Sequence, residues 1–237
     1  MILSDHINLR LKLLDSSYKV ISTCDVPKLP HDVCLTGERE AAAAVNNDVE
    51  DRHEIHFFRV RSGRLLKTRT IKLQHCCRGI AHHSGDLFIA TGFSLHVYNI
   101  LGDQSRELYS DQTGKYTVCG CAVSPDGSRV FIINRTHKKL ITLNKDGTKL
   151  STLTHQELQG LEAVHITSLG HVFVSCLGLD TVVQVVRMKD GKQTVKTLTG
   201  KKDILKSPIT LYFNSSNNTL VVGQYDNDNI VELQLKP

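Results

Sequence analysis

Twelve histidines are the residues of this 237-residue chain that could most readily bind a metal or assist a nucleophile. Local groups occur at His53 and His56 and at the adjacent pair His82 and His83. A zinc or non-haem iron site needs further ligands at fixed spacing, and neither HExxH nor CxxC occurs in the sequence. Neighbouring strand residues such as His82 and His83 also point to opposite faces. We therefore expect solvated or structural histidines, no metal site and no cofactor.

Seven cysteines are the second reactive set, namely Cys24, Cys34, Cys76, Cys77, Cys119, Cys121 and Cys176. Their number is odd, no pair has CxxC spacing, and Cys119 and Cys121 would share one face of a strand. Buried, reduced thiols are the simplest interpretation, and they favour a reducing compartment. No signal peptide and no apolar stretch of about 18–20 residues is found, so we expect a cytoplasmic protein without membrane contact.

An internal repeat organises these residues. Five copies align on the residues that would open a first strand, which are Asp32, Gly79, Gly120, Glu162 and Thr210. The steps between them are 47, 41, 42 and 48 residues. A period in the forties that contains four short strands is typical of the blade of a β-propeller.

The copy that starts at Cys121 shows the pattern inside one blade. A strand over 121–124 leads to the turn Pro125-Asp126-Gly127, and further strands are expected over 129–133, 139–144 and 148–153. Asp-Gly turns favour tight hairpins. Four antiparallel strands in one sheet cannot bury both faces alone, so such blades must stack on one another.

Six hairpins between second and third strands predict an all-β fold, a six-bladed β-propeller with 22 strands. The first blade would lack its first strand and the last blade its fourth, so we expect a piece of a longer polypeptide. Residues 38–54 form an acidic insertion around Ala41–Val45, whose small side chains suit a tightly packed strand. We predict a single domain over 1–237, with blades over about 1–28, 29–75, 76–115, 116–158, 159–205 and 206–237.

The first hairpin, SDHINLRL from Ser4 to Leu11, resembles the NHL repeat, in which an Asp, an Asn and an Arg precede an apolar strand. Looser versions begin at Ile133 and Gly223, although Asn229 stands in the last copy where the Arg is expected. The chain as a whole resembles the NHL-type propeller at the C-terminus of tripartite-motif (TRIM) proteins. That resemblance implies a protein- or RNA-binding module of a ubiquitin-ligase family, whose catalytic RING and zinc-binding B-boxes lie outside this sequence.

A lactonase-like hydrolase is the enzymatic alternative, because some six-bladed propellers hold a catalytic cation with acidic residues around the central axis. The residues that open the first strands include two carboxylates, Asp32 and Glu162, and also Arg78, which would repel a cation. GxSxG, GxGxxG and Walker motifs are missing from the sequence. We therefore expect a non-enzymatic binding platform.

Loops before first strands and turns between second and third strands should lie on one face of a propeller. Arg, His, Lys and aromatic residues on that face suit protein recognition. The same residue types suit single-stranded RNA, which is the alternative partner. A net charge of +5 that is spread along the chain gives no reason to expect DNA. Self-association would depend on upstream segments. The predicted face comprises His31, Arg52, Arg78, Phe93, Tyr116, Arg135, His137, Lys138, Tyr225 and Asn227.

Overall fold

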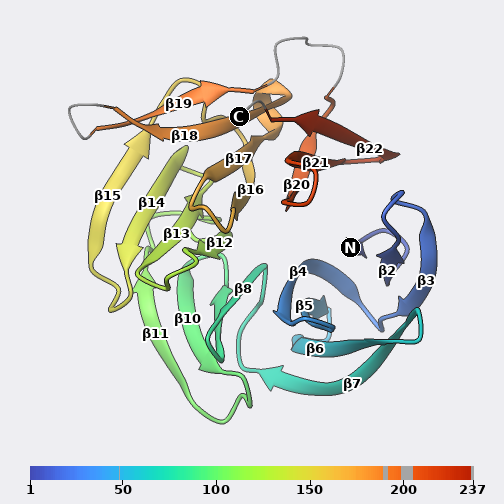
Figure 1. Ribbon diagram of the computed structural model, residues 1–237. Coiled ribbons are helices and arrows are strands. Elements are labelled where there is room, and N and C mark those ends of the chain that lie inside the picture. Colours follow the sequence, from blue (N-terminus) through green and yellow to red (C-terminus); the bar gives the residue numbers. More distant parts are fainter. Residues whose placement is uncertain (48, 189–191, 199–204, 236–237) are drawn as a thin grey trace. The chain divides into compact units, whose positions relative to one another are not determined.

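The computed structural model describes residues 1–47, 49–188, 192–198 and 205–235. In this part of the chain, 22 strands and one short 3-10 turn, Leu177–Leu179, form six antiparallel sheets in sequence order (Figure 1). The predicted all-β class and strand number are confirmed. The six sheets are the blades of a six-bladed β-propeller, numbered here blade 1 to blade 6.

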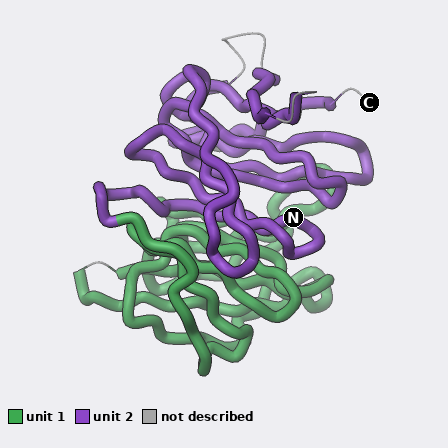
Figure 2. The backbone as a smooth tube through the Cα atoms, turned by 90° about the vertical axis from the view of Figure 1, so that its left-hand side faces the viewer, with its two compact units in different colours: residues 1–111 green, residues 112–237 purple. Residues whose placement is uncertain are grey.

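The chain divides into two compact units, 1–111 and 112–237, which are described separately (Figure 2). Unit 1 contains blades 1 to 3, in which each strand pairs with the next along the chain. Their strands are β1 (Ile2–Asp5), β2 (Arg10–Leu14) and β3 (Val20–Asp25); β4 (Leu29–Gly37), β5 (Glu40–Asn47), β6 (Arg52–Arg61) and β7 (Arg64–Leu73); and β8 (Gly79–His83), β9 (Asp86–Ala90), β10 (Ser94–Asn99) and β11 (Ser105–Ser110).

Unit 2 contains blades 4 to 6, built with the same strand order. Blades 1 and 6 each have three strands, as the sequence predicted. The strands of unit 2 are β12 (Gly120–Val123), β13 (Arg129–Asn134), β14 (Lys139–Asn144) and β15 (Lys149–Thr154); β16 (Leu161–Ile166), β17 (Val172–Cys176), β18 (Thr181–Arg187) and β19 (Gln193–Thr197); and β20 (Pro208–Asn214), β21 (Thr219–Gln224) and β22 (Asn227–Gln234).

The second strands of blades 2 and 5 are buried on both faces, because each of these blades packs against two others of its own unit. Ala41–Ala44 of β5 are completely buried, which confirms the tightly packed strand expected from the alanine run. Ala42 and Ala44 pack with Ile89 of blade 3, whereas Ala43 packs with Leu11 of blade 1. Side chains that alternate between the two faces of a strand produce this division.

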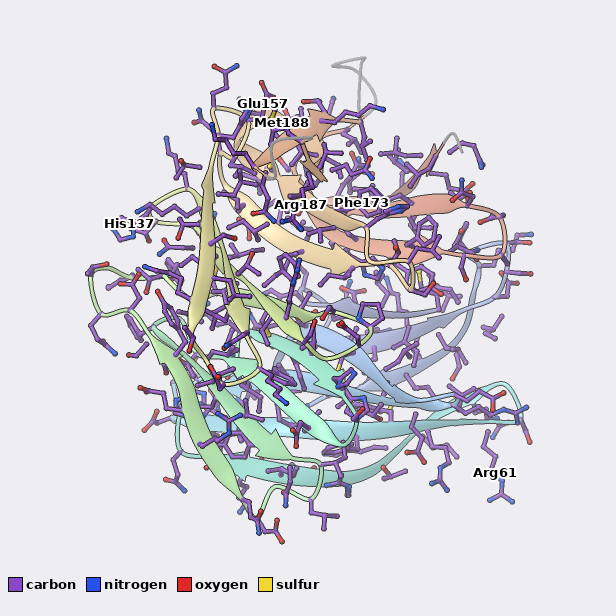
Figure 3. The ribbon with its side chains drawn as sticks, turned by 60° about the vertical axis from the view of Figure 1, so that its left-hand side comes forward. Arg61, His137, Glu157, Phe173, Arg187 and Met188 are labelled. Atoms are coloured by element: carbon purple, nitrogen blue, oxygen red, sulfur yellow. The ribbon has the colours of Figure 1, made fainter. Side chains whose placement is uncertain are left out.

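Unit 2 repeats this packing. Phe131 and Ile133 of blade 4 lie in one cluster with Val174 of blade 5. On the other face of blade 5, the fully buried Phe173, labelled in Figure 3, packs with Leu220 of blade 6. Apolar residues therefore cover both faces of the second strands of blades 2 and 5, and their removal from water favours folding.

We call the turn between the second and third strands of a blade the middle turn; in blade 1, which lacks a first strand, it joins β1 to β2. Each middle turn contains one residue with a left-handed backbone conformation. The six residues with positive φ are Leu9 (52°), Asp51 (49°), Gly92 (111°), Lys138 (53°), Asp180 (52°) and Asp226 (51°). Gly, Asn and Asp adopt this conformation readily, whereas other residues are strained by about 1–2 kcal/mol. Leu9 and Lys138 are therefore the two strained residues among the six.

Leu9→Asn is expected to stabilise the protein by about 1 kcal/mol, because Asn tolerates the left-handed conformation that Leu9 must adopt. The side chain of Leu9 is partly exposed, and its carbonyl oxygen still accepts the N–H of Val26 after the change. Denaturant unfolding measures the effect. Leu9→Ala is the matched control, since alanine removes the same apolar surface without relieving the strain; equal gains for both variants would contradict this explanation.

Candidate binding face

The middle turns and the loops before first strands are joined by hydrogen bonds within unit 2. The amide of Arg135, in the middle turn of blade 4, donates to the carbonyl oxygen of Tyr116 in the loop before β12 at 3.0 Å. Nζ of Lys138 donates to Oε1 of Gln159, which lies in the loop before β16, at 3.2 Å. The two loop classes therefore contribute to one surface in this unit.

The same arrangement continues between blades 5 and 6. The amide of Ser207, before β20, donates to Oδ1 of Asp180 in the middle turn of blade 5 at 2.6 Å. The carbonyl oxygen of Ser207 accepts the amide of Tyr225 at 2.9 Å, so the loop connects two middle turns. Ser207 therefore links the middle turn that carries Leu179 to the middle turn that carries Tyr225.

Unit 1 has corresponding contacts. The ring nitrogen Nδ1 of His6, in the middle turn of blade 1, lies 3.2 Å from the carbonyl oxygen of Pro30. The amide of Arg78, before β8, donates to the carbonyl oxygen of Ala90 at 2.8 Å. The side chain of Arg78 lies over Gly92, where a Cβ would be 3.7 Å from Nε. The aliphatic and guanidinium parts of Arg78 are thus placed beside the turn that carries Phe93.

Seven of the ten predicted face residues lie in these turns and loops. They are Arg78 and Phe93 in unit 1 and Tyr116, Arg135, His137, Lys138 and Tyr225 in unit 2. His137, labelled in Figure 3, belongs to the middle turn of blade 4, well away from the buried Phe173. Phe93, Tyr116 and Tyr225 are exposed, at 42%, 39% and 61%.

Three of the ten residues lie in strands rather than in loops, and their place on the binding face stays a prediction. His31 is inside β4, because that strand begins earlier than expected, at Leu29, and its ring stands edge-on to His6 at 4.9 Å. Arg52 opens β6, and its Nη1 lies 3.4 Å from Oε2 of Glu50. Asn227 opens β22 and accepts the amide of Asn229 at 2.9 Å. The last two contacts join residues that are two positions apart in the chain.

Four exposed apolar residues of the middle turns are not among the residues predicted for the face. Ile7, Leu9 and Val49 in unit 1 are 65%, 36% and 96% exposed, and Leu179 in unit 2 is 40% exposed. Turns are usually built from Gly, Asn, Asp, Ser and Pro, so a large apolar residue in a turn was the available signal. In the described part of the chain, the turns between first and second strands contain a single exposed large apolar residue, Leu169.

The NHL-like triplet in the first hairpin has a local structural role. Both carboxylate oxygens of Asp5 accept the side-chain amide of Asn8, at 3.0 and 2.9 Å. Nζ of Lys12 lies 2.6 Å from the same carboxylate, and Nε of Arg10 lies 3.5 Å from Oδ1 of Asp25. The hydrogen bonds and the Lys12 ion pair lower the pKa of Asp5 against the opposing effect of burial, which is the largest single influence. The triplet closes the turn that exposes Ile7.

An ion pair connects the middle turn of blade 4 to blade 5. Nη2 of Arg135 lies 2.8 Å from Oε1 of Glu162, the second residue of β16. Burial raises the pKa of Glu162, and the positive charge of Arg135 opposes that effect. Part of Arg135 remains exposed, so its guanidinium can also contact a bound molecule. The face of unit 2 therefore combines a held arginine with the exposed ring of Tyr116.

Two half-buried groups on first strands accept hydrogen bonds from the next blade. Oδ2 of Asp32 in β4 accepts the amide of Ile80 in β8 at 2.9 Å, and Oδ1 accepts the amide of Val33. Nε2 of His165 in β16 accepts the amide of Phe213 in β20 at 3.3 Å. Burial raises the pKa of Asp32 to about 6 and lowers the pKa of His165 to about 4. The two carboxylates considered for an axial cation, Asp32 and Glu162, thus link blades within their own units.

All seven cysteines lie in the described residues, and none forms a disulfide. Burial raises the pKa of Cys119 to about 11 and that of Cys176 to about 12. A thiol with such a pKa is protonated at neutral pH and is a poor nucleophile. Within the described ranges, no three His, Cys, Asp or Glu side chains are placed to hold a metal ion. No helix among the described residues is long and apolar enough to cross a membrane.

Comparison with known proteins extends the fold assignment. No protein-family model and no curated protein matches the chain. Solved structures do match. A protein of unknown function from Bacteroides thetaiotaomicron aligns with TM-score 0.78 and 9% identity over 98% of this chain and 65% of its own. A chain of a nidogen/laminin complex aligns with TM-score 0.76 and 14% identity over 99% and 88%.

A putative 6-phosphogluconolactonase from Bacteroides uniformis also aligns, with TM-score 0.67 and 11% identity over 95% of this chain and 89% of its own. Identities this low concern the fold alone. Six successive antiparallel blades, together with alignment over nearly the whole chain, define the protein as a six-bladed β-propeller.

Proposed function

We propose that this propeller is a non-enzymatic recognition module that binds a protein through its middle turns. The observation that carries the proposal is the recurrence of exposed apolar or aromatic residues in those turns. Unit 1 presents Ile7, Val49 and Phe93, and unit 2 presents Leu179 and Tyr225. Aromatic and arginine side chains dominate the binding energy of many protein interfaces. Apolar residues repeated in one class of turn differ from singly scattered ones, which need no explanation.

The surroundings of these residues support the proposal. Tyr116 and Arg135 are neighbours through a backbone hydrogen bond, and Arg135 is oriented by Glu162. Such pre-organisation reduces the entropy lost when side chains are fixed on binding. The resemblance of the first hairpin to the NHL repeat supports a more specific form of the proposal, in which the module recruits substrates for a TRIM-like ubiquitin ligase in the cytoplasm.

Charge substitution at one middle turn of each unit tests the function. Phe93→Glu and Tyr225→Glu are expected to weaken capture of the protein partner by about 30-fold or more, because each places a charge in an apolar contact. The measurement is quantitative proximity labelling in cells, followed by titration with the proteins that depend on both turns. Leu169→Glu is the matched control, since Leu169 is 78% exposed in a turn between first and second strands.

The Leu169→Glu control tests whether the middle turns are the site, and the salt dependence of binding distinguishes a protein ligand from RNA. A partner set that Leu169→Glu changes as much as Phe93→Glu does would contradict recognition by the middle turns. Single-stranded RNA is the competing ligand, and its binding weakens steeply as salt rises because phosphate contacts release counterions. Capture that is lost after ribonuclease treatment, with a steep salt slope, would replace the protein partner with RNA.

A further inference from the structure

The hairpin of β6 and β7 in blade 2 carries the excess positive charge of the chain. Residues 59–72 contain six of the 29 Lys and Arg residues and none of the 24 Asp and Glu residues. The rest of the chain has 23 cationic and 24 anionic side chains, which nearly balance. The corresponding hairpins of blades 3 and 4 include acidic residues such as Glu107 and Asp146. The net charge, which we expected to be spread along the chain, is thus concentrated in one hairpin.

Arg61 and Arg64 face each other directly across this hairpin. Like charges in this position destabilise a sheet, because the Cβ atoms of facing residues are only about 4.5–5.5 Å apart. Ser62 and Gly63, which both have positive φ, form the tight two-residue turn that keeps the pair together. In the described strands, all other facing pairs of Asp, Glu, Lys or Arg join opposite charges, namely Asp5 with Arg10, Arg10 with Asp25, Glu40 with Arg59 and Glu54 with Lys72.

Further arginines share a face of the sheet with this pair. Directly opposite residues lie on the same face, and so do alternate residues of one strand. The strand pairing therefore places Arg59 and Leu66, which face each other, and also Arg69 on the side of Arg61 and Arg64. Arg61, labelled in Figure 3, extends outward from the protein. We call the surface formed by these five residues the arginine face.

Two of the four arginines are held by neighbouring groups. The guanidinium carbon of Arg69 lies 3.5 Å from the centre of the Phe57 ring, and its Nη2 donates to the carbonyl oxygen of Ile100 in blade 3. Nε of Arg59 donates to Oε1 of Glu40 at 2.9 Å.

The facing pair itself is available to a ligand. Arg61 and Arg64 are exposed, and among the described residues neither has an ion-pair partner. Leu66, beside them, is 45% exposed. The arginine face therefore offers two uncompensated guanidinium groups next to an apolar side chain, and an anion bound between the two groups would remove their repulsion.

We propose that the arginine face binds an extended acidic segment of another protein. Guanidinium groups bind carboxylates with two parallel hydrogen bonds. Alternate side chains of an extended peptide are about 7 Å apart, as are those of Arg59 and Arg61 in β6, so carboxylates at alternate positions would match both. Leu66 provides the contact for an apolar residue in the same segment.

Two further features define this site. Single-stranded RNA matches it less well, because the two aromatic residues of the hairpin, Phe57 and Phe58, are buried and provide no surface for base stacking. The facing arginines also lie at the end of β6 that is remote from the middle turn of blade 2. The site is therefore separate from the middle turns and does not depend on the proposed function.

A synthetic peptide tests the site. The probe is a capped nine-residue peptide with Glu at the first, third, seventh and ninth positions, Leu at the fifth and Thr at the others. It is titrated at low salt into the full chain, and NMR shifts of backbone amides and arginine Nε–H groups are followed. The expected result is saturable binding that shifts residues 59–69 and weakens as salt rises, because exposed ion pairs are screened. The same peptide with Gln in place of every Glu should bind at least about tenfold more weakly.

Paired substitutions locate the binding. Arg61→Gln together with Arg64→Gln should weaken binding of the Glu peptide about tenfold, since each exposed ion pair changes an affinity by up to about fivefold. Arg129→Gln together with Lys149→Gln, an exposed change of the same charge in blade 4, should leave the affinity within about twofold. Replacing both Arg61 and Arg64 with Lys should give an intermediate affinity, because Lys keeps the charge but not the planar fork.

Several outcomes would overturn the proposal. One is equal affinity for the Glu and Gln peptides, and another is an equal loss in the two Gln double variants. Shifts confined to residues outside 59–69, or no binding at millimolar peptide in low salt, would do the same. A uridine oligonucleotide that binds this hairpin more tightly than the peptide would replace the acidic protein segment with RNA. Phe93→Glu and Tyr225→Glu should bind the peptide normally, which separates failure of this site from failure of the proposed function.

Discussion

Asp32→Asn is expected to remove a pH dependence of about 3 kcal/mol from the free energy of unfolding. Burial raises the pKa of Asp32 in the folded protein to about 6, from an ordinary value of 3.8. Below about pH 4 the carboxyl is protonated in both states. As the pH rises from about 4 to about 6, the unfolded chain releases the proton first, so stability is lost over this window. At 1.36 kcal/mol per pH unit, the loss is about 3 kcal/mol.

Urea unfolding of wild type and Asp32→Asn at several pH values between 4 and 7 measures the difference. Wild type should be more stable relative to the variant at pH 4 than at pH 6.5. Asp86→Asn is the control, because Asp86 is exposed at the start of β9 in the same unit. Parallel curves for wild type and Asp32→Asn would show that the carboxyl of Asp32 is not enclosed in the folded state.

His165→Gln is expected to remove a pH dependence of similar size and opposite sign. Burial lowers the pKa of His165 to about 4, from an ordinary value of 6.5. Above pH 6.5 the imidazole is neutral in both states, and Nε2 accepts the amide of Phe213. As the pH falls from about 6.5 to about 4, the unfolded chain gains the proton first, so about 3 kcal/mol of stability is lost.

Gln retains an acceptor near the position of Nε2 and does not titrate, so the variant should unfold with a weaker acid dependence than wild type. Unfolding at pH 7 and at pH 4.5 gives the comparison. His171→Gln is the control, because His171 is exposed in the turn that leads into β17. An acid-induced loss of stability that persists in His165→Gln would assign the dependence to other groups.

These two effects oppose each other in the same pH window. Acidification strengthens the contribution of Asp32 and weakens that of His165. A flat pH profile of wild type would therefore not show that buried ionisable groups are missing. Only the two variants, measured side by side, separate the contributions, and their slopes should have opposite signs.

The number of blades and the positions of most strands were predictable from the sequence because they depend on local patterns. The Asp-Gly turns and the spacing of apolar strands fixed the number of blades, and β14 has the bounds expected for it, Lys139–Asn144. The three-stranded blades 1 and 6 followed from the same pattern. Strand ends were less certain, because backbone pairing extends beyond the apolar residues. β4 starts at Leu29, and this shift moved His31 from the predicted loop into the strand.

Features that depend on contacts between blades were not predictable. Asp32 meets Ile80, and His165 meets Phe213, each 48 residues further along the chain. A local pattern cannot show that an ionisable side chain will accept an amide from the following blade. Asp32 was considered for an axial cation, although its oxygens are held by backbone amides. Val49 and Leu179 are neither charged nor aromatic, so the residue types typical of a binding face did not indicate them.

Main-chain hydrogen bonds fix the middle turns of blades 4 and 6. The amide of Arg135 bonds to the carbonyl of Tyr116, and the amide of Tyr225 bonds to the carbonyl of Ser207. These backbone hydrogen bonds do not depend on which side chains stand at positions 135 and 225. Substitutions at Tyr225 can alter the ligand without altering the scaffold, much as loops vary on an antibody framework. Substitution of Arg135 would also remove the ion pair with Glu162. The turns of this propeller are therefore suitable positions for a randomised library from which new binders could be selected.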